Sequence, residues 1–83
     1  MRIEIKYFAS IREAVGQGSE ALETGASDLR SLRDELIARG GAYAEALARG
    51  KAVRMAINQS LSDELAQLED GAEVAFFPPV TGG

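Results

Sequence analysis

The feature that most constrains the fold is one amphipathic helix set among short β-prone segments. Its apolar residues fall on a single face: Leu29, Leu32, Leu36 and Ile37. Ser27 is expected to cap the first turn, with Asp28 near the positive end of the helix dipole, and Gly40-Gly41 to end the helix. Because one helix covers only one face of a sheet, the chain is predicted to form a two-layer α+β domain.

The segments on either side of this helix predict the strands of the sheet. Residues 2–8 alternate apolar and charged or aromatic side chains, which indicates a half-buried strand. Three of its residues are expected to face the helix: Ile3, Ile5 and Tyr7. Four further strands are expected, at residues 20–23, 53–57, around Leu61, and 73–77.

Two shorter helical turns are also predicted, the first after a capping box from Ser10 to Glu13 and the second over residues 43–49. A hairpin, a crossing helix and returning strands together favour a β-grasp fold, with a mixed sheet packed on one main helix. We expect this domain to span residues 1–77 and to be followed by an extended tail over residues 78–83.

Composition excludes several function classes. The 83 residues contain no cysteine and no histidine, which rules out thiolate nucleophiles, Cys/His zinc sites and His-based triads. The net charge of −4 argues against binding of nucleic acid, which needs clustered Lys and Arg. No apolar run approaches the roughly 18 residues that a membrane span needs, and the N-terminal residues lack a secretory signal, so a cytoplasmic location is expected.

The charged residues are predicted to be surface groups. Five acidic residues have irregular spacing, which favours a solvated edge over a metal site: Asp63, Glu64, Glu69, Asp70 and Glu73. Six dispersed arginines are expected to lie on the surface: Arg12, Arg30, Arg33, Arg39, Arg49 and Arg54. Tyr43 is expected to pack rather than react.

The end of the chain carries the strongest functional signal. Pro78 and Pro79 stop the last strand and favour an extended path, as do the β-branched Val80 and Thr81. Gly82-Gly83 has no side chains, so it fits a channel too narrow for other residues and leaves the terminal carboxylate unhindered. We therefore expect Gly83 to react through its carboxylate.

Three apolar residues are predicted to form a docking face for a partner protein. In the last strand, Val74 and Phe76 are the better core candidates, which leaves Phe77 on the opposite face together with Phe8. Leu61 stands alone between two serines on a short polar strand. Exposed apolar patches of this kind usually mark partner sites.

The residues from Gly71 to Gly83 (GAEVAFFPPVTGG) closely resemble the C-terminus of the MoaD branch of the ubiquitin-like MoaD/ThiS sulfur-carrier family. Residues 8–13 (FASIRE) and 56–59 (AINQ) are similar to the same family. The resemblance implies a non-catalytic carrier subunit with no permanently bound cofactor and no side-chain active site. It also supports docking through the apolar face, since family members use an equivalent surface.

The resemblance further implies a reaction sequence at Gly83. A ubiquitin-activating-like adenylyltransferase, with ATP and its own magnesium, would link AMP transiently to Gly83, and a sulfur donor would then convert the adenylate into a thiocarboxylate. The tail would enter the MoaE-like large subunit of molybdopterin synthase, in an expected heterotetramer. There it would donate sulfur to cyclic pyranopterin monophosphate to build the molybdopterin dithiolene.

Two alternatives stay open at this point. The first is a ThiS-like carrier for thiazole synthesis, although the Phe-Phe-Pro-Pro sequence favours the molybdopterin branch. The second is a ubiquitin-like modifier conjugated to target lysines. A self-contained enzyme is disfavoured because histidine and cysteine are absent.

Overall fold

The structure is a computed structural model that describes residues 1–79. Within this range the chain forms five strands and three helices, with these bounds: β1 Arg2–Tyr7, α1 Ala9–Val15, β2 Ser19–Glu23, α2 Leu29–Ile37, α3 Gly41–Leu47, β3 Arg54–Ile57, β4 Ser60–Ser62 and β5 Glu73–Phe77. Each predicted strand is present, and both predicted short helices form.

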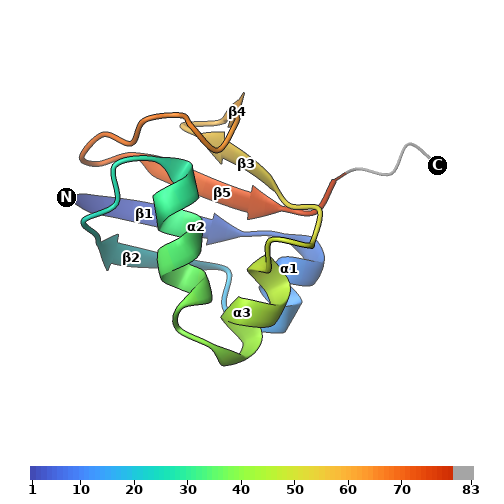
Figure 1. The fold of residues 1–83 in the computed structure, drawn as a ribbon. Helices are drawn as coiled ribbons and strands as arrows, with labels where there is room; N and C mark the ends of the chain where they lie inside the picture. The colour runs from blue at the N-terminus through green and yellow to red at the C-terminus, as the bar shows by residue number, and fades with distance from the viewer. Residues whose placement is uncertain (80–83) are drawn as a thin grey trace.

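The five strands make one mixed sheet in the order β2-β1-β5-β3-β4. β1 and β5 are parallel neighbours at its centre, whereas the other three pairs are antiparallel. The three helices lie on one face of this sheet, and β5 ends on the side of the molecule away from the N-terminus (Figure 1). The predicted β-grasp architecture is confirmed, with a second sheet face that no helix covers.

The core lies between the sheet and the helices. Nine large side chains are less than 2% exposed: Ile3, Ile5, Tyr7, Leu29, Leu32, Leu36, Leu47, Val74 and Phe76. The rings of Tyr7 and Phe76, on the parallel central strands, stack with centroids 6.2 Å apart. Burial of each such side chain stabilises the fold by roughly 1.5–3 kcal/mol. The predicted inward faces of β1, α2 and β5 are therefore correct.

A tight turn between β3 and β4 sets the position of Leu61. Asn58 and Gln59 both have positive φ, at 48° and 70°, as a two-residue type I′ hairpin requires. The Asn58 side chain also accepts a hydrogen bond from the backbone N–H of Glu73 at 2.9 Å. The turn is thereby tied to the start of β5, and Leu61 is placed opposite Ala56.

The predicted start of α2 is wrong by one residue. Asp28, not Ser27, is the N-cap, and its Oδ1 accepts a hydrogen bond from the backbone N–H of Ser31 at 2.8 Å. Ser27 instead accepts a hydrogen bond through its carbonyl from the N–H of Leu68. The chain is therefore still extended at Ser27, where it pairs with the loop before β5.

The predicted capping box at Ser10 is also wrong. The N-cap of α1 is Phe8, two residues before Ser10, and it makes no side-chain capping bond, so the helix begins at Ala9. The backbone carbonyl of Phe8 accepts from the N–H groups of Ile11 and Arg12, so the strand passes directly into the helix. Ser10 therefore lies inside the first turn, where its hydroxyl has no capping position.

The end of α2 is only partly as predicted. The helix stops at Ile37, earlier than the expected glycine pair. Gly40 has the expected positive φ, 77°, and donates its N–H to the carbonyl of Ile37. Its left-handed conformation turns the chain directly into α3.

Arg33 is not a surface residue, contrary to the sequence prediction. It is 5% exposed, and its guanidinium donates to three carbonyls at the end of α3 and just after it: Leu47 at 2.8 Å, Ala48 at 2.7 Å and Lys51 at 3.1 Å. It also pairs with Glu64 at 3.2 Å. A buried charge needs such partners, and here they fasten the α3–β3 connection to α2.

Within residues 1–79, no helix is long and apolar enough to cross a membrane.

Candidate docking face and tail root

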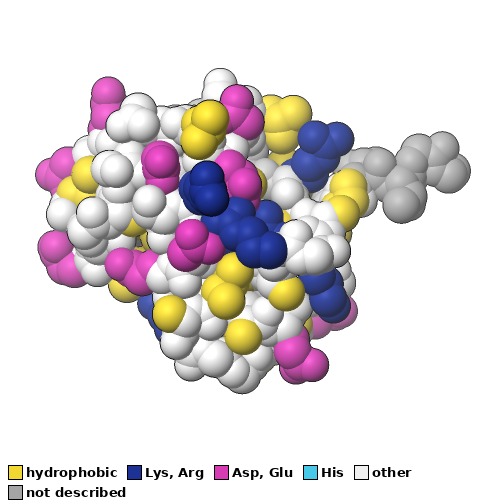
Figure 2. Space-filling view, in the orientation of Figure 1, with side chains coloured by type: hydrophobic (Ala, Val, Ile, Leu, Met, Phe, Trp, Pro, Cys, Tyr) yellow, Lys and Arg dark blue, Asp and Glu magenta, His cyan; other side chains and the backbone are white. Residues whose placement is uncertain are grey.

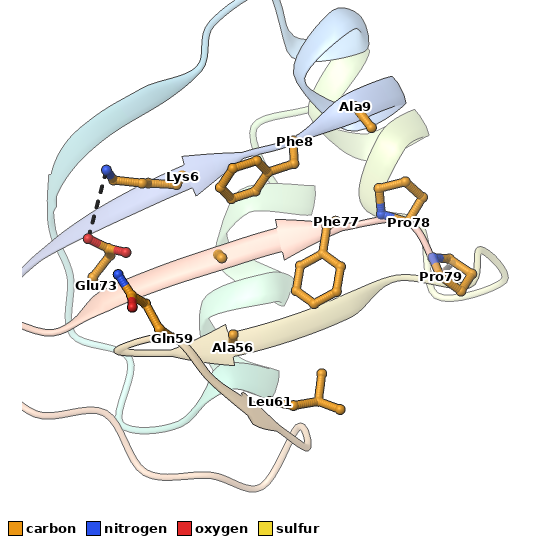
Figure 3. Close-up of a pocket in the computed structure, with 11 residues that line it drawn as sticks. Lys6, Phe8, Ala9, Ala56, Gln59, Leu61, Glu73, Phe77, Pro78 and Pro79 are labelled. Carbon is orange, nitrogen blue, oxygen red and sulfur yellow. Dashed lines mark ion pairs between the residues drawn. The ribbon is translucent and has the colours of Figure 1, made fainter. Parts of the chain in front are cut away.

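The uncovered face of the sheet carries an open apolar depression of about 890 Å³. It is lined from β1, α1, β3, β4, β5 and the residues after β5: Lys6, Phe8, Ala9, Ala56, Gln59, Leu61, Glu73, Ala75, Phe77, Pro78 and Pro79. Figure 3 shows the rings of Phe8 and Phe77 close together, with Leu61 beyond them from β4. The three predicted docking residues therefore share one surface, which we call the docking face.

Strand alternation explains why these side chains point outward. Phe76 is fully buried in the core, so its neighbour Phe77 projects from the opposite face of β5, where it is half-buried. Phe8 is 46% exposed and Leu61 is 67% exposed. Large apolar side chains are not stabilised by such exposure, and their convergence indicates a surface that a partner covers.

Small side chains make the floor of the docking face. Ala75 on β5 pairs in register with Ala56 on β3, and neither extends far above the backbone. At the rim, the Lys6 ammonium lies 3.8 Å from a carboxylate oxygen of Glu73. Sequence reasoning did not select these four residues. Period-two alternation along β3 and β5 is the signal that could have found the two alanines.

Pro78 and Pro79 connect the docking face to the end of the chain. Both are half-buried, and both line the depression. Pro78 also lines a smaller cavity of about 170 Å³ between α1 and residues 51–53. The chain thus leaves β5 along the docking face. The other predicted tail residues, Val80, Thr81, Gly82 and Gly83, lie outside the described residues.

The side chains whose pKa values are most clearly shifted lie away from the docking face. The Glu20 carboxylate accepts from Arg39 at 2.8 and 2.9 Å and from the hydroxyl of Tyr7 at 2.9 Å. The hydrogen bonds from Arg39 chiefly lower the pKa of Glu20, and burial chiefly raises the pKa of Tyr7. Tyr43 packs edge-on against Tyr7 in this cluster, as expected. All of these groups are paired, so the cluster is a structural link between β2, α2 and α3.

The five acidic residues predicted to form a solvated edge all lie within residues 1–79. That range contains no group of three or more Asp or Glu residues placed to hold a metal ion. Glu64 is engaged by Arg33 and Arg49. The most distinctive surface of the described residues is therefore the apolar depression that reaches Pro78 and Pro79.

The fold and this surface define a ubiquitin-like β-grasp protein with an exposed apolar face beside Pro78 and Pro79. The ThiS family model matches residues 5–83, and the chain belongs to that family.

Full-length relatives are similar to the chain throughout. The molybdopterin synthase sulfur carrier subunit of Escherichia coli is 41% identical over 81 residues, covering 98% of this chain and 99% of the relative. The Haemophilus influenzae subunit of the same name is 38% identical with the same coverage. Among solved structures, a Helicobacter pylori complex of subunits 1 and 2 of molybdopterin-converting factor matches with a TM-score of 0.70 and 30% identity, over 100% of both chains.

Proposed function

We propose that this chain is the sulfur carrier subunit of a molybdopterin synthase. The main support for this proposal is that the chain is 41% identical, over 98% of its length, to a protein named as a sulfur carrier subunit. The geometry supports the assignment, because an apolar docking face runs along β5 to Pro78 and Pro79, which only Val80 and Thr81 separate from Gly82-Gly83. A carrier needs this combination of a binding surface and a slender reactive end.

The proposed reactive group is the carboxylate of Gly83. A carboxylate has a pKa near 3.5, so it is ionised at neutral pH and is a poor electrophile. Its activation requires adenylation by a ubiquitin-activating-like adenylyltransferase that consumes ATP and carries the magnesium. Displacement of AMP by sulfur then leaves a thiocarboxylate. The chain supplies no cysteine to compete for that sulfur.

The thiocarboxylate would be consumed in the large subunit of the synthase. We infer that the docking face binds this MoaE-like subunit in a heterotetramer while the tail delivers sulfur to cyclic pyranopterin monophosphate. Two sulfurs make one dithiolene, so two loaded carriers serve each product. The same face would bind the activating enzyme, which requires exchange between the two partners. The proposed location is the cytoplasm.

Mass spectrometry tests the proposal directly. After incubation with the matching activating enzyme, ATP, magnesium and a sulfur source, the intact chain should gain the mass of one oxygen-to-sulfur exchange. Fragmentation should place that change on Gly83. The matched control is the same chain with one alanine added after Gly83, which moves the carboxylate and should abolish the mass gain.

Two results would contradict the proposal. Sulfur on another residue, or unimpaired loading of the extended chain, would show that the Gly83 carboxylate is not the reactive group. A ladder of isopeptide-linked proteins in cells, with no free thiocarboxylate, would instead favour a ubiquitin-like modifier.

A further inference from the structure

Arg54 lies at the edge of the docking face, next to Phe77. It is the first residue of β3 and is exposed, while the next residue, Met55, is buried on the helix side. Alternation therefore puts Arg54 on the uncovered face of the sheet. It pairs in register with Phe77.

The register places Leu61 diagonally across from Arg54. Leu61 is opposite Ala56, two residues after Arg54 on the same face of β3. Arg54 and Leu61 together line a groove next to the docking face. Arg54 thus lies between strands that carry Phe77 and Leu61. A partner that covers both apolar residues must also cover Arg54.

Arg54 has no ion-pair partner among residues 1–79. Two acidic residues line the same groove, but both are engaged elsewhere. Asp63 accepts the backbone N–H of Leu65 at 2.8 Å, and Glu64 pairs with Arg33 and Arg49. Lys6, the cation at the opposite rim, is already paired with Glu73. Among residues 1–79, Arg54 is therefore a cation at the edge of the docking face that forms no ion pair.

We propose that the protein partner bound to the docking face presents an Asp or Glu carboxylate to Arg54. The inference rests on the proposed function, since it describes the partner of the same face. A guanidinium removed from water without a counter-charge is strongly unfavourable, whereas a carboxylate can accept two parallel hydrogen bonds from it. The pairing also fixes how the partner is oriented against Phe77, and hence where the tail enters.

Two arginines of the helix-covered side, unlike Arg54, have carboxylate partners. Figure 2 shows that side, where Lys and Arg side chains lie among Asp and Glu side chains. Arg33 and Arg49 pair with carboxylates there. Arg54, on the uncovered face of the sheet, has no such pair within residues 1–79.

The test compares two charge reversals of equal size. Arg54→Glu changes the docking face, whereas Arg30→Glu changes an exposed residue of α2 on the helix-covered side. The equilibrium Kd for the large subunit of molybdopterin synthase is measured by calorimetry with both variants. We expect Arg54→Glu to raise Kd by about tenfold or more and Arg30→Glu by less than about twofold. Circular dichroism melting checks that both variants fold.

A charge swap identifies the carboxylate. Acidic residues of the large subunit are changed singly to Lys, and one of these changes should restore binding of Arg54→Glu while weakening binding of the unaltered chain. An unchanged Kd for folded Arg54→Glu, or no restoring substitution, would overturn the inference and leave the proposed function standing. Failure of the unaltered chain to bind the large subunit would overturn both.

Discussion

Phe76 and Phe77 are adjacent on β5, so replacing each with alanine separates folding from docking. Phe76 is fully buried and stacks on Tyr7, whereas Phe77 is half-buried and lines the docking face. Phe76→Ala should therefore destabilise the fold by about 3–5 kcal/mol, the usual effect of deleting a core phenylalanine. That is a large share of the roughly 5–15 kcal/mol that stabilises a small domain.

Phe77→Ala should instead weaken binding of the partner more than it weakens folding. Truncation of an aromatic residue at the centre of an interface commonly weakens binding by about 2 kcal/mol or more, which is roughly thirtyfold in Kd. Its effect on unfolding should stay below about 1.5 kcal/mol, because the ring loses only partial burial.

Two assays compare the Phe76→Ala and Phe77→Ala variants. Urea unfolding gives the free energy of each variant, and thermal melting should show Phe76→Ala lowered by more than about 10 °C. Calorimetric titration with the large subunit gives Kd at a temperature where each variant is folded. If Phe77→Ala unfolds the domain while Phe76→Ala leaves it stable with weakened binding, the assignment of the two strand faces is wrong.

Two further predictions concern the polar contacts of the fold. Arg33→Met should lower the free energy of unfolding by about 3 kcal/mol, because three carbonyls and Glu64 lose their donor. Urea unfolding measures this loss, and Arg30→Met is the control that should show no comparable loss. Glu20 has a folded-state pKa below its ordinary value of 4.5, so its contribution to stability is complete above that pH and is lost as pH falls through the folded-state pKa. Melting temperatures of the unaltered chain and Glu20→Gln should therefore differ most near pH 7 and converge as the pH falls below 4.5 and through the folded-state pKa of Glu20. A constant difference across this range would disprove the assignment.

Periodic patterns predicted the faces of the elements well. Successive side chains of a strand point to opposite faces of the sheet. Alternation along β5 therefore assigned Phe76 to the core and Phe77 to the other face from the sequence alone. Phe8 and Phe77 followed from the same rule, whereas Leu61 was selected as an apolar residue between two serines. The three residues converge on one surface. The place of Arg54 between Phe77 and Leu61 required the register of β3, which a local pattern does not determine.

Contacts between residues far apart in the chain could not be predicted from local sequence patterns. Arg33 was placed on the surface because its acceptors are carbonyls 14 to 18 residues away, and nothing near Arg33 marks them. The cap of α2 was misplaced by one residue because pairing of Ser27 with Leu68 keeps the chain extended to that point. At Ser10 the local motif was present, but the direct passage of β1 into α1 determined where the helix begins.

The parallel pairing of β1 and β5 also has a mechanical consequence. A partner that holds the tail and then releases it pulls on the chain along the axis of β5. This strand is central, with four register pairs to β1 and four to β3. Because ladder hydrogen bonds run across the strands, such a load shears both ladders together, whereas peeling an edge strand such as β4 would open its bonds in turn. If the tail is inserted and withdrawn as proposed, the position of β5 would let the body withstand the traction of repeated cycles.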